Sequence, residues 1–339
     1  MIDSTVPILK YLIAGRITRD YIIFPDGYFT EDVLGGNVLY AGVGLRLWDS
    51  NIGLVSKVGE DYPQAWLEKT KKSFDIRGVK VVPDSFDTRF FRAYQDAENY
   101  SEADPMAHYA GINTPYPKTL LGYQNPVFNL DSRTQPNHHT IRLTDIPSDY
   151  FDVTAAHLCP LDYLSHSLLS GTLKQGQTTT ITLEPSPGYM DPIFWDDIPA
   201  IINGLSAFIP FENNLCDLFV GRTTDLWEMA QTIASWGCEY VVIQRGQRGF
   251  LLYDHSRRKK YIVPVYQTEI KNVHGFSDAF CGGFLAGLHQ TYDPVEAALY
   301  GSISASFVGD GYDAFYALDC MESLLRARLD ALRSRVVEV

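Results

Sequence analysis

The hydrophobic pattern near the start of the chain predicts a strand, a helix and a second strand. The apolar run at residues 8–14 has the length and composition of a buried strand. After a pair of glycines, residues 37–49 (NVLYAGVGLRLWD) space their apolar side chains as a helix does, and residues 51–59 (NIGLVSKVG) form another strand-like run. Together these segments predict a β-α-β unit with an insertion between its first strand and its helix.

Strand-like runs continue through the rest of the chain and are separated by segments with helical spacing. This alternation is typical of a mainly parallel sheet with helices on both faces. The sequence contains no internal repeat and no low-complexity tract. We therefore predict a doubly wound α/β fold in which residues 1–339 form a single domain. Its later parallel strands are expected within residues 155–160, 178–188, 205–211 and 240–246.

Two segments look instead like half-exposed strands of a small second sheet. They are residues 20–32, in the insertion, and residues 88–94 (TRFFRAY). We expect them to form a lid, which spans about residues 16–32 and 86–112. The edges of so small a sheet need cover, and pairing of two lids in a homodimer would provide it. The alternative is that the aromatic side chains of the lid pack within one chain.

Two other segments are interpreted as surface features. Residues 129–149 are polar and rich in turn-forming residues, which indicates a surface excursion and not a linker between domains. Residues 318–339 form an amphipathic helix, and a solvated charged face is the expected meaning of its arginines. These arginines are Arg326, Arg328, Arg333 and Arg335.

The composition narrows the function more than it narrows the fold. The 339 residues include 28 Lys or Arg and 41 Asp or Glu, and the net charge of −13 argues against a nucleic-acid or anionic-membrane binder. The five cysteines are scattered without C-x-x-C spacing, so we expect neither a disulfide framework nor a zinc site. No segment reaches the roughly 18 apolar residues of a membrane span. We expect a cytoplasmic protein.

The stretch Asn272 to Leu288, NVHGFSDAFCGGFLAGL, places a single carboxylate where a glycine-containing turn enters a helix. The first N–H groups of a helix lack intrahelical acceptors and favour an anion. Asp278 could take a proton from an attacking hydroxyl there, while the preceding N–H groups stabilise a transferring phosphoryl group. The alternative is that Ser277 or Asp278 merely caps the helix, a contribution of about 1 kcal/mol.

Other familiar chemistries find little support. The sequence has no Walker A motif and no G-x-S-x-G nucleophile elbow. Gly42 and Gly44 resemble the start of a dinucleotide fingerprint, but they lie inside the predicted helix, so we interpret them as packing residues. His138 and His139 are adjacent on a polar loop without further ligands at useful spacing, and we expect them to be solvated.

Together the motifs resemble the ribokinase-like (PfkB) carbohydrate kinase family over nearly the whole chain. The family carries an Asp five residues after the Gly that ends the first strand, a Gly-Gly pair before the first core helix, a K-V-G-x-D pattern, a glycine-containing nucleotide-side strand and a G-A-G-D-A-F signature. The matching stretches are Gly15 to Asp20, Gly35-Gly36, Lys57 to Asp61, residues 241–254 (VVIQRGQRGFLLYD) and residues 275–288 (GFSDAFCGGFLAGL).

The resemblance implies a role for each matching position. ATP with Mg²⁺ would supply the phosphoryl group, and a small-molecule polyol would receive it. Asp278 would be the catalytic base, and Gly275, Phe276 and Ser277 would form the anion hole. Implied substrate-binding residues are Asp20, Gly35 and Gly36, and implied nucleotide-binding residues are Gln244, Gly246 and Gly249. We also expect Tyr40 and Arg89 to bind the substrate by shaping its pocket.

The chain also departs from the family pattern at its expected active site. Phe276-Ser277 stands for Ala-Gly, Tyr40 for an Asn and Gln244 for a Thr. The family's N-x-x-E motif falls on residues 211–214, where Glu212, one step out of register, is the candidate metal residue. Two functions follow. One is a kinase acting on a sugar, inositol or nucleoside, and the other is a polyol-binding protein that has lost phosphoryl transfer.

Overall fold

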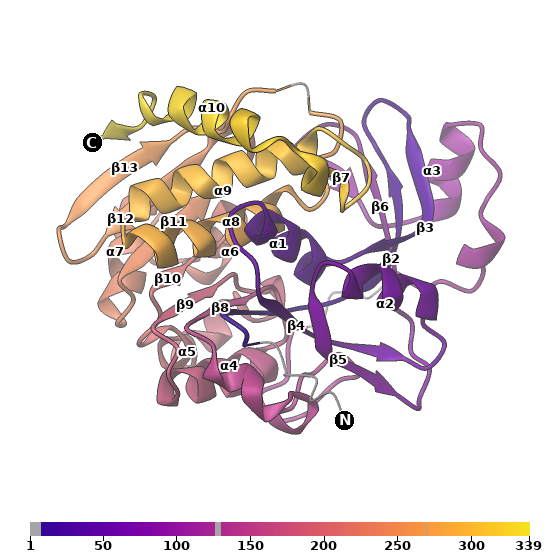
Figure 1. Cartoon of the computed structure of the whole chain (residues 1–339), viewed down its shortest axis with the longest axis horizontal. Helices are drawn as coiled ribbons and strands as arrows, with labels where there is room; N and C mark the ends of the chain where they lie inside the picture. Colours follow the sequence, from indigo (N-terminus) through magenta and orange to yellow (C-terminus); the bar gives the residue numbers. More distant parts are fainter. Residues whose placement is uncertain (1–7, 126–129, 269) are drawn as a thin grey trace, which may run out of the picture.

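The computed structural model describes residues 8–125, 130–268 and 270–339, and its largest element is a ten-stranded sheet (Figure 1). Neighbouring strands follow the order β14-β13-β12-β11-β10-β9-β8-β1-β4-β5. In chain order these strands are β1 (Tyr11–Ala14), β4 (Ile52–Gly59), β5 (Asp75–Val82), β8 (Ala155–Leu158), β9 (Thr180–Leu183), β10 (Ala207–Phe208), β11 (Tyr240–Gln244), β12 (Phe250–Asp254), β13 (Lys259–Val263) and β14 (Val337–Glu338).

The strands from β11 to β5 all pair in parallel, whereas β12, β13 and β14 add an antiparallel edge. Strand β1 lies inside the parallel part, where Tyr11 pairs with Ile52 on one side and Ala155 on the other. The predicted doubly wound, mainly parallel α/β fold is confirmed, together with each core strand expected from the sequence. The carboxyl ends of parallel strands meet at one edge, which is where such folds bind ligands.

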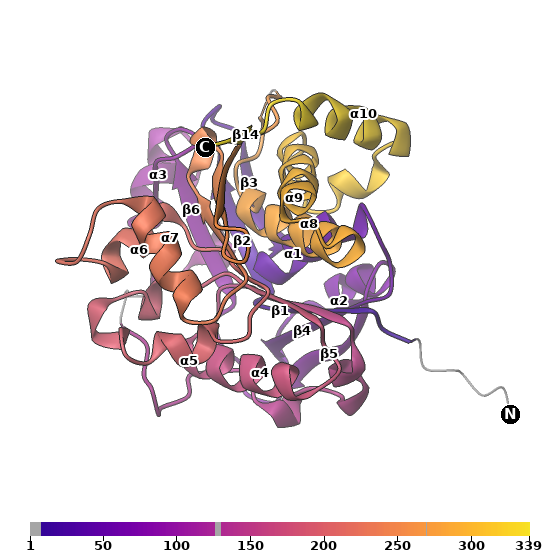
Figure 2. The same cartoon turned by 90° about the vertical axis from the view of Figure 1, so that its left-hand side faces the viewer.

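One face of the sheet is covered by α1 (Asn37–Arg46), α8 (Phe276–Thr291) and α9 (Pro294–Gly309), with α10 (Glu322–Arg333) outside them (Figure 2). Helices α1 and α8 touch through their backbones. A Cβ atom on Gly44 would lie 2.2 Å from the Ala279 carbonyl oxygen, and one on Gly282 would lie 1.8 Å from that of Ala41. The glycines of α1 are therefore packing residues, as the sequence predicts.

The opposite face is covered by α4 (Tyr163–Gln175), α5 (Ile198–Ile202), α6 (Glu212–Leu218) and α7 (Leu226–Ser235), which share a second hydrophobic core with the sheet. Helix α2 is Gln64–Lys71, and α3 is Pro105–Gly111. None of the helices within the described ranges combines the length and apolar character needed to cross a membrane. Short 3-10 helices occupy Lys118–Leu120, Leu143–Asp145, Ser148–Asp152, Pro187–Tyr189, Pro192–Phe194, Gly246–Arg248 and Tyr316–Asp319.

The predicted second sheet is present and has four strands in the order β3-β2-β6-β7. They are β2 (Thr18–Ile23), β3 (Phe29–Gly35), β6 (Arg89–Tyr94) and β7 (Tyr100–Ser101). Strand β3 is half-exposed as expected. Phe91 of β6 is instead fully buried, because Tyr109 of α3 and Leu120 cover it. Lid aromatics thus pack within one chain, while the homodimer through the lid edges stays a prediction.

The excursion at residues 130–149 lies on the surface but is anchored, and Asn129 falls outside the described residues. Ile141 is buried, and the backbone N–H of Ile141 donates to Ser165 Oγ at 2.8 Å. The expectation of two solvated histidines is wrong for His139. Its ring packs edge-on against Phe86, and burial lowers its pKa to about 4. His138 is exposed.

The C-terminal segment corrects another expectation. Helix α10 ends at Arg333, and the chain then adds β14 to the sheet edge, so residues 318–339 are not one helix. Arg328 does not belong to a solvated face, because only 11% of its side chain is exposed. It donates to Asp310 Oδ2 at 2.7 Å and to Ser306 Oγ at 2.9 Å, which ties α10 to the end of α9.

This anchoring gives a stability prediction. Replacing Arg328 by Ala removes charge-assisted hydrogen bonds from a mostly buried side chain, so the free energy of unfolding should fall by about 1.5–3 kcal/mol. Arg326 is the matched control, because it lies on the same helix, its side chain is 73% exposed and it pairs only with Glu322. Arg326→Ala should cost less than about 0.5 kcal/mol. Urea unfolding of both variants measures the difference, and equal costs would contradict the anchoring role.

Candidate functional site

Helix α8 begins at Phe276 without a side-chain cap. Its N-cap residue is Gly275, in the left-handed conformation with φ of 75°. A Cβ atom at this position would lie 2.2 Å from Cγ of Tyr40, so only glycine lets the turn pass so close to that ring. Neither Ser277 nor Asp278 caps the helix, which removes the purely structural reading of the motif. The first N–H groups of α8 remain without intrahelical acceptors.

The ring of Phe276 bears on whether these N–H groups can meet a ligand. Phe276 is half-buried and packs against the main hydrophobic core. Its Cδ2 atom would lie 3.7 Å from a Cβ atom on Gly309, at the end of α9. The ring therefore lies on the core side of the turn, and Phe276 is compatible with an anion at the start of α8.

Asp20 is placed on lid strand β2 and is almost fully buried. Its carboxylate packs directly against Gly35, where a Cβ atom would lie 1.8 Å from Asp20 Oδ2. Gly36 follows with φ of 110° and begins α1, which carries Tyr40. The glycine pair thus accommodates the carboxylate of Asp20 and the sharp entry into the helix, and the structure brings four of the five substrate-binding candidates together.

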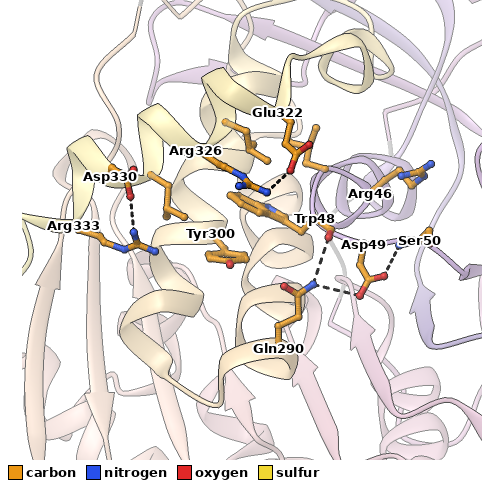
Figure 3. A pocket seen from close by; sticks show the side chains of 13 residues that line it. Arg46, Trp48, Asp49, Ser50, Gln290, Tyr300, Glu322, Arg326, Asp330 and Arg333 are labelled. Atoms are coloured by element: carbon orange, nitrogen blue, oxygen red, sulfur yellow. Dashed lines mark hydrogen bonds and ion pairs between the residues drawn. The ribbon is translucent and has the colours of Figure 1, made fainter.

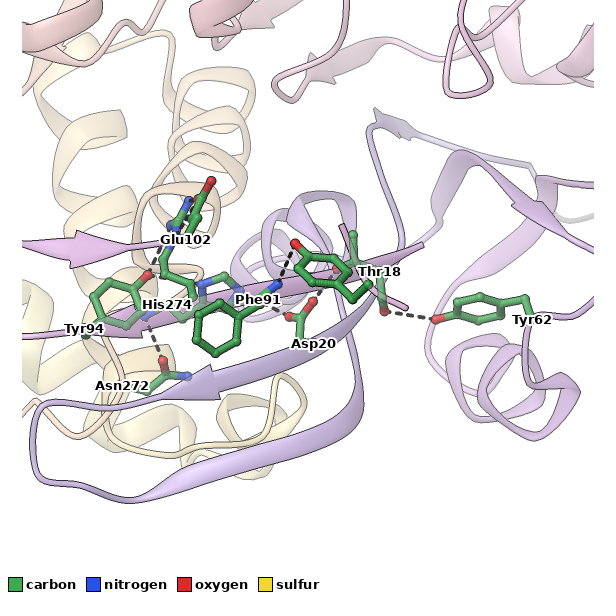
Figure 4. A network of polar contacts seen from close by, with 10 residues as sticks. Thr18, Asp20, Tyr62, Phe91, Tyr94, Glu102, Asn272 and His274 are labelled. Carbon is green, nitrogen blue, oxygen red and sulfur yellow. Dashed lines mark hydrogen bonds and ion pairs between the residues drawn. The ribbon is translucent and has the colours of Figure 1, made fainter. Parts of the chain in front are cut away.

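A histidine that the sequence interpretation did not select joins Asp20 to α8 (Figure 4). His274 Nε2 lies 3.1 Å from Asp20 Oδ2, and His274 Nδ1 lies 3.1 Å from the hydroxyl of Tyr94. Tyr40 meets the imidazole edge-on, and Phe90 stacks on it. The sequence could have indicated His274, because it directly precedes Gly275 of the motif.

The alternation of β6 explains why Arg89 does not reach this site. Phe90, Arg92 and Tyr94 face His274, so residue 89 points to the other side of the strand. There Arg89 bonds Asp87 and the carbonyl oxygens of Thr119 and Leu121. Arg92 is the lid arginine on the site face. Period-two counting within TRFFRAY would have indicated it.

A second carboxyl group, also absent from the sequence interpretation, lies beside the start of α8. Glu184 follows β9 directly and is 1% exposed. Its Oε1 accepts hydrogen bonds from Ser277 Oγ at 2.8 Å and from Gln244 Nε2 at 3.2 Å. The signal was its place at the carboxyl end of a parallel strand. The side chain of Gln244 is thus buried within the site. It bonds Glu184, Ser277 and the Ile209 carbonyl oxygen, and it is not exposed towards a nucleotide.

The two carboxyl groups titrate differently. Burial raises the pKa of Glu184 to about 8, and the charge of Asp278 adds to the shift. Burial also raises the pKa of half-buried Asp278, to about 6, while interactions with His274 and Arg92 lower it. Asp278 therefore gives up its proton before Glu184 does. It is the group that can serve as a base near neutral pH.

The nucleotide-side glycines flank a tight turn. Gly246 and Gly249 have φ of 57° and 76°, and the turn between them lies under the tip of the lid. Glu98, in the connection between β6 and β7, accepts a hydrogen bond from the Gln247 N–H at 3.2 Å. The lid tip and the predicted nucleotide loop are therefore in direct contact.

The residues that fit a magnesium ion are not those of the shifted motif. Glu212 begins α6 and pairs with Arg248 at 2.6 Å, and nothing in the described ranges connects it to Asp278. Glu184 and Asp278, in contrast, form no ion pair with any described Lys or Arg. Mg²⁺ prefers one or two carboxylates together with phosphate oxygens. The carboxyl pair therefore fits the ion, whereas Glu212 does not.

A pocket of about 760 Å³ lies away from this site, between the end of α1 and helices α9 and α10 (Figure 3). Trp48 and Tyr300 stack in it with ring centroids 3.9 Å apart. Two of its arginines are already neutralised, Arg326 by Glu322 and Arg333 by Asp330. The residues that line this pocket do not combine a candidate base with an anion site. The start of α8 is therefore the candidate site.

Residues 153–312 match the model of the pfkB family carbohydrate kinases. The chain is 26% identical over 281 residues to a cytidine kinase of Thermococcus kodakarensis, which covers 82% of this chain and 88% of that protein. The fold is similar to that of a putative ribokinase II of E. coli solved with ATP and Mg²⁺ (TM-score 0.69, 14% identity, 95% and 99% of the two chains). It is also similar to a Burkholderia thailandensis nucleoside kinase solved with inosine (TM-score 0.68, 17% identity, 96% and 98%).

The raised pKa of Asp278 predicts how stability depends on pH. A carboxyl group whose folded-state pKa is near 6 holds its proton more tightly than in the unfolded chain, so it makes stability fall as pH rises towards 6. Asparagine cannot ionise. We expect Asp278→Asn to raise the unfolding temperature at pH 8 and to give a smaller gain at pH 4.5, by calorimetry.

The exposed Asp196 provides the control for this measurement. Asp196→Asn should change the unfolding temperature by a similar small amount at both pH values, because an exposed carboxyl keeps the same surroundings when the chain unfolds. A gain for Asp278→Asn that is independent of pH, or a loss at pH 8, would contradict the raised pKa.

Proposed function

We propose that this chain, a divergent member of the ribokinase-like (PfkB) family, is a kinase that transfers the γ-phosphoryl group of ATP to a hydroxyl of a sugar or nucleoside. The observation that carries the proposal is the start of α8. Asp278 lies there on an uncapped helix N-terminus, and His274, four residues earlier, contacts the buried Asp20. A base, an anion site and a hydroxyl-binding carboxylate are thereby collected at one place.

Each residue has a role in this reaction. Asp20 accepts hydrogen bonds from substrate hydroxyls and orients the reacting one. Asp278 takes the proton from that hydroxyl as its oxygen attacks phosphorus. The N–H groups at the start of α8 stabilise the charge on the transferring phosphoryl group, and Mg²⁺, held by Glu184 and Asp278, would neutralise phosphate charge. Most of the catalysis is then positioning and electrostatic stabilisation.

The aromatic residues around His274 favour a ring-shaped substrate. Tyr40, Phe90 and Tyr94 surround His274, and all three aromatic side chains lie within contact of the imidazole. Aromatic rings bind the faces of sugars and bases, while Asp20 selects for hydroxyl groups. The 26% identity to a cytidine kinase adds support for a nucleoside. A ribonucleoside presents both kinds of surface.

Turnover tests the proposal directly. With Mg²⁺-ATP at high enzyme concentration, a panel of nucleosides, sugars and inositols should include a compound that gives ADP and a phosphorylated product. Asp278→Asn keeps the shape and removes the base, so kcat should fall by roughly 10²-fold or more. Asp196→Asn controls for the loss of one negative charge. If no compound turns over faster with the wild-type chain than with Asp278→Asn, the kinase assignment fails.

A second candidate function is a polyol-binding protein without phosphoryl transfer. It is favoured by one specific feature, the Glu212–Arg248 ion pair, which occupies the carboxylate of the shifted metal motif. Titration calorimetry separates the two functions. The kinase should bind Mg²⁺-ATP with micromolar affinity, whereas polyol binding with no detectable heat from the nucleotide would favour the binding protein.

A further inference from the structure

Behind the start of α8, three side chains of the kinds that ligate metals converge from three elements. His157 lies on β8, Glu184 follows β9, and Cys281 lies on α8. One ligand atom from each lies within 4.8 Å of the others, and all three side chains are buried. A tetrahedral zinc with bonds of about 2.0–2.3 Å spaces its ligand atoms roughly 3.3–3.8 Å apart. Small side-chain movements would close the cluster on an ion.

The imidazole of His157 is arranged as that of a metal ligand. His157 is 0% exposed, and its Nε2 has no hydrogen-bond partner. Nδ1 lies 2.9 Å from Thr182 Oγ1. A ligating histidine typically donates its other ring N–H to a neighbouring oxygen, which fixes the tautomer and leaves a lone pair for the metal. A buried nitrogen without any hydrogen-bond partner otherwise destabilises the fold.

The acidic groups of the cluster have no Lys or Arg beside them in the part of the chain that the structure describes. Cys281 Sγ lies 3.3 Å from Glu184 Oε2, and Asp278 is one helical turn before Cys281. No described Lys or Arg forms an ion pair with Glu184. A divalent ion would neutralise the carboxylate and a thiolate together. A donor set of imidazole nitrogen, thiolate sulfur and carboxylate oxygen suits Zn²⁺ better than the hard ions Mg²⁺ or Ca²⁺.

We infer that His157, Glu184 and Cys281 bind a structural Zn²⁺ that fastens α8 to strands β8 and β9. The ion engages Glu184 through Oε2, on the side of Cys281, so that Oε1 stays free to hold Ser277 in the anion turn. The site shares Glu184 with the magnesium position proposed at the phosphate, but its other two ligands, His157 and Cys281, and its chemistry differ. It stands whether or not the chain transfers phosphoryl groups. Cysteine spacing could not indicate it, because each ligand comes from a different element.

Metal analysis of the full-length chain tests the inference. The protein, produced with added ZnSO₄ and dialysed against metal-free buffer, should retain about one zinc per chain by mass spectrometry of the metal. Cys281→Ser and His157→Gln should retain at least about tenfold less. Cys238→Ser is the matched control, because Cys238 is also buried but its thiol bonds the Tyr240 carbonyl and lies outside the cluster, so its zinc content should equal that of the wild type.

A spectroscopic readout guards against variants that fail to fold. The wild-type chain refolded with CoCl₂ should show sulfur-to-cobalt charge-transfer absorption in the near ultraviolet, together with visible bands of tetrahedral Co²⁺. Cys238→Ser should give the same spectrum. Wild-type protein without retained zinc and without this absorption would overturn the inference, as would equal zinc contents in folded wild type and folded Cys281→Ser.

Discussion

The close packing of α1 against α8 is the constraint on which the candidate site depends. Gly44 and Gly282 let the two helices meet backbone to backbone, and Gly275 lets the turn before α8 pass close to the ring of Tyr40. A side chain at any of these positions would push the contacting segments apart. Since α1 begins directly after the glycine pair that accommodates Asp20, the contact fixes the carboxylate of Asp20 relative to Asp278. The geometry of the candidate site is thus a consequence of helix packing.

Several polar groups that are buried or half-buried lie together at the start of α8. Two carboxyl groups with raised pKa values, an uncapped helix start and a histidine between lid and core each cost stability if considered alone. Local rules are typically broken at sites where function requires it. The two hydrophobic cores on the faces of the large sheet offset this loss of stability. The departures from the family motif belong to the same network, since Ser277 and Gln244 both bond Glu184.

The sequence predicts the fold well because strand and helix periodicities repeat over long stretches, and because Gly35-Gly36 and the motif around Asp278 mark chain positions with strict conformational needs. It predicts the site less completely. Arg89 was chosen by residue type, whereas strand alternation places Arg92 on the site face. Glu184 and His157 become meaningful only when β8, β9 and α8 lie side by side. The solvated face assigned to Arg328 failed because Asp310, its partner, ends a different helix. A single sequence does not show which distant elements are in contact.

The contact between Glu98 and the Gln247 N–H has a thermodynamic consequence. That N–H belongs to the turn between Gly246 and Gly249, so any ligand that accepts its hydrogen bond competes with the lid tip for the same donor. Ligand binding at the turn and the contact of the lid tip with the turn are then thermodynamically coupled. The coupling is reciprocal. The free energy by which a bound ligand weakens the contact of the lid tip equals the free energy by which that contact weakens ligand binding. A single carboxylate at the tip of the lid thereby couples the lid to the turn at residues 246–249.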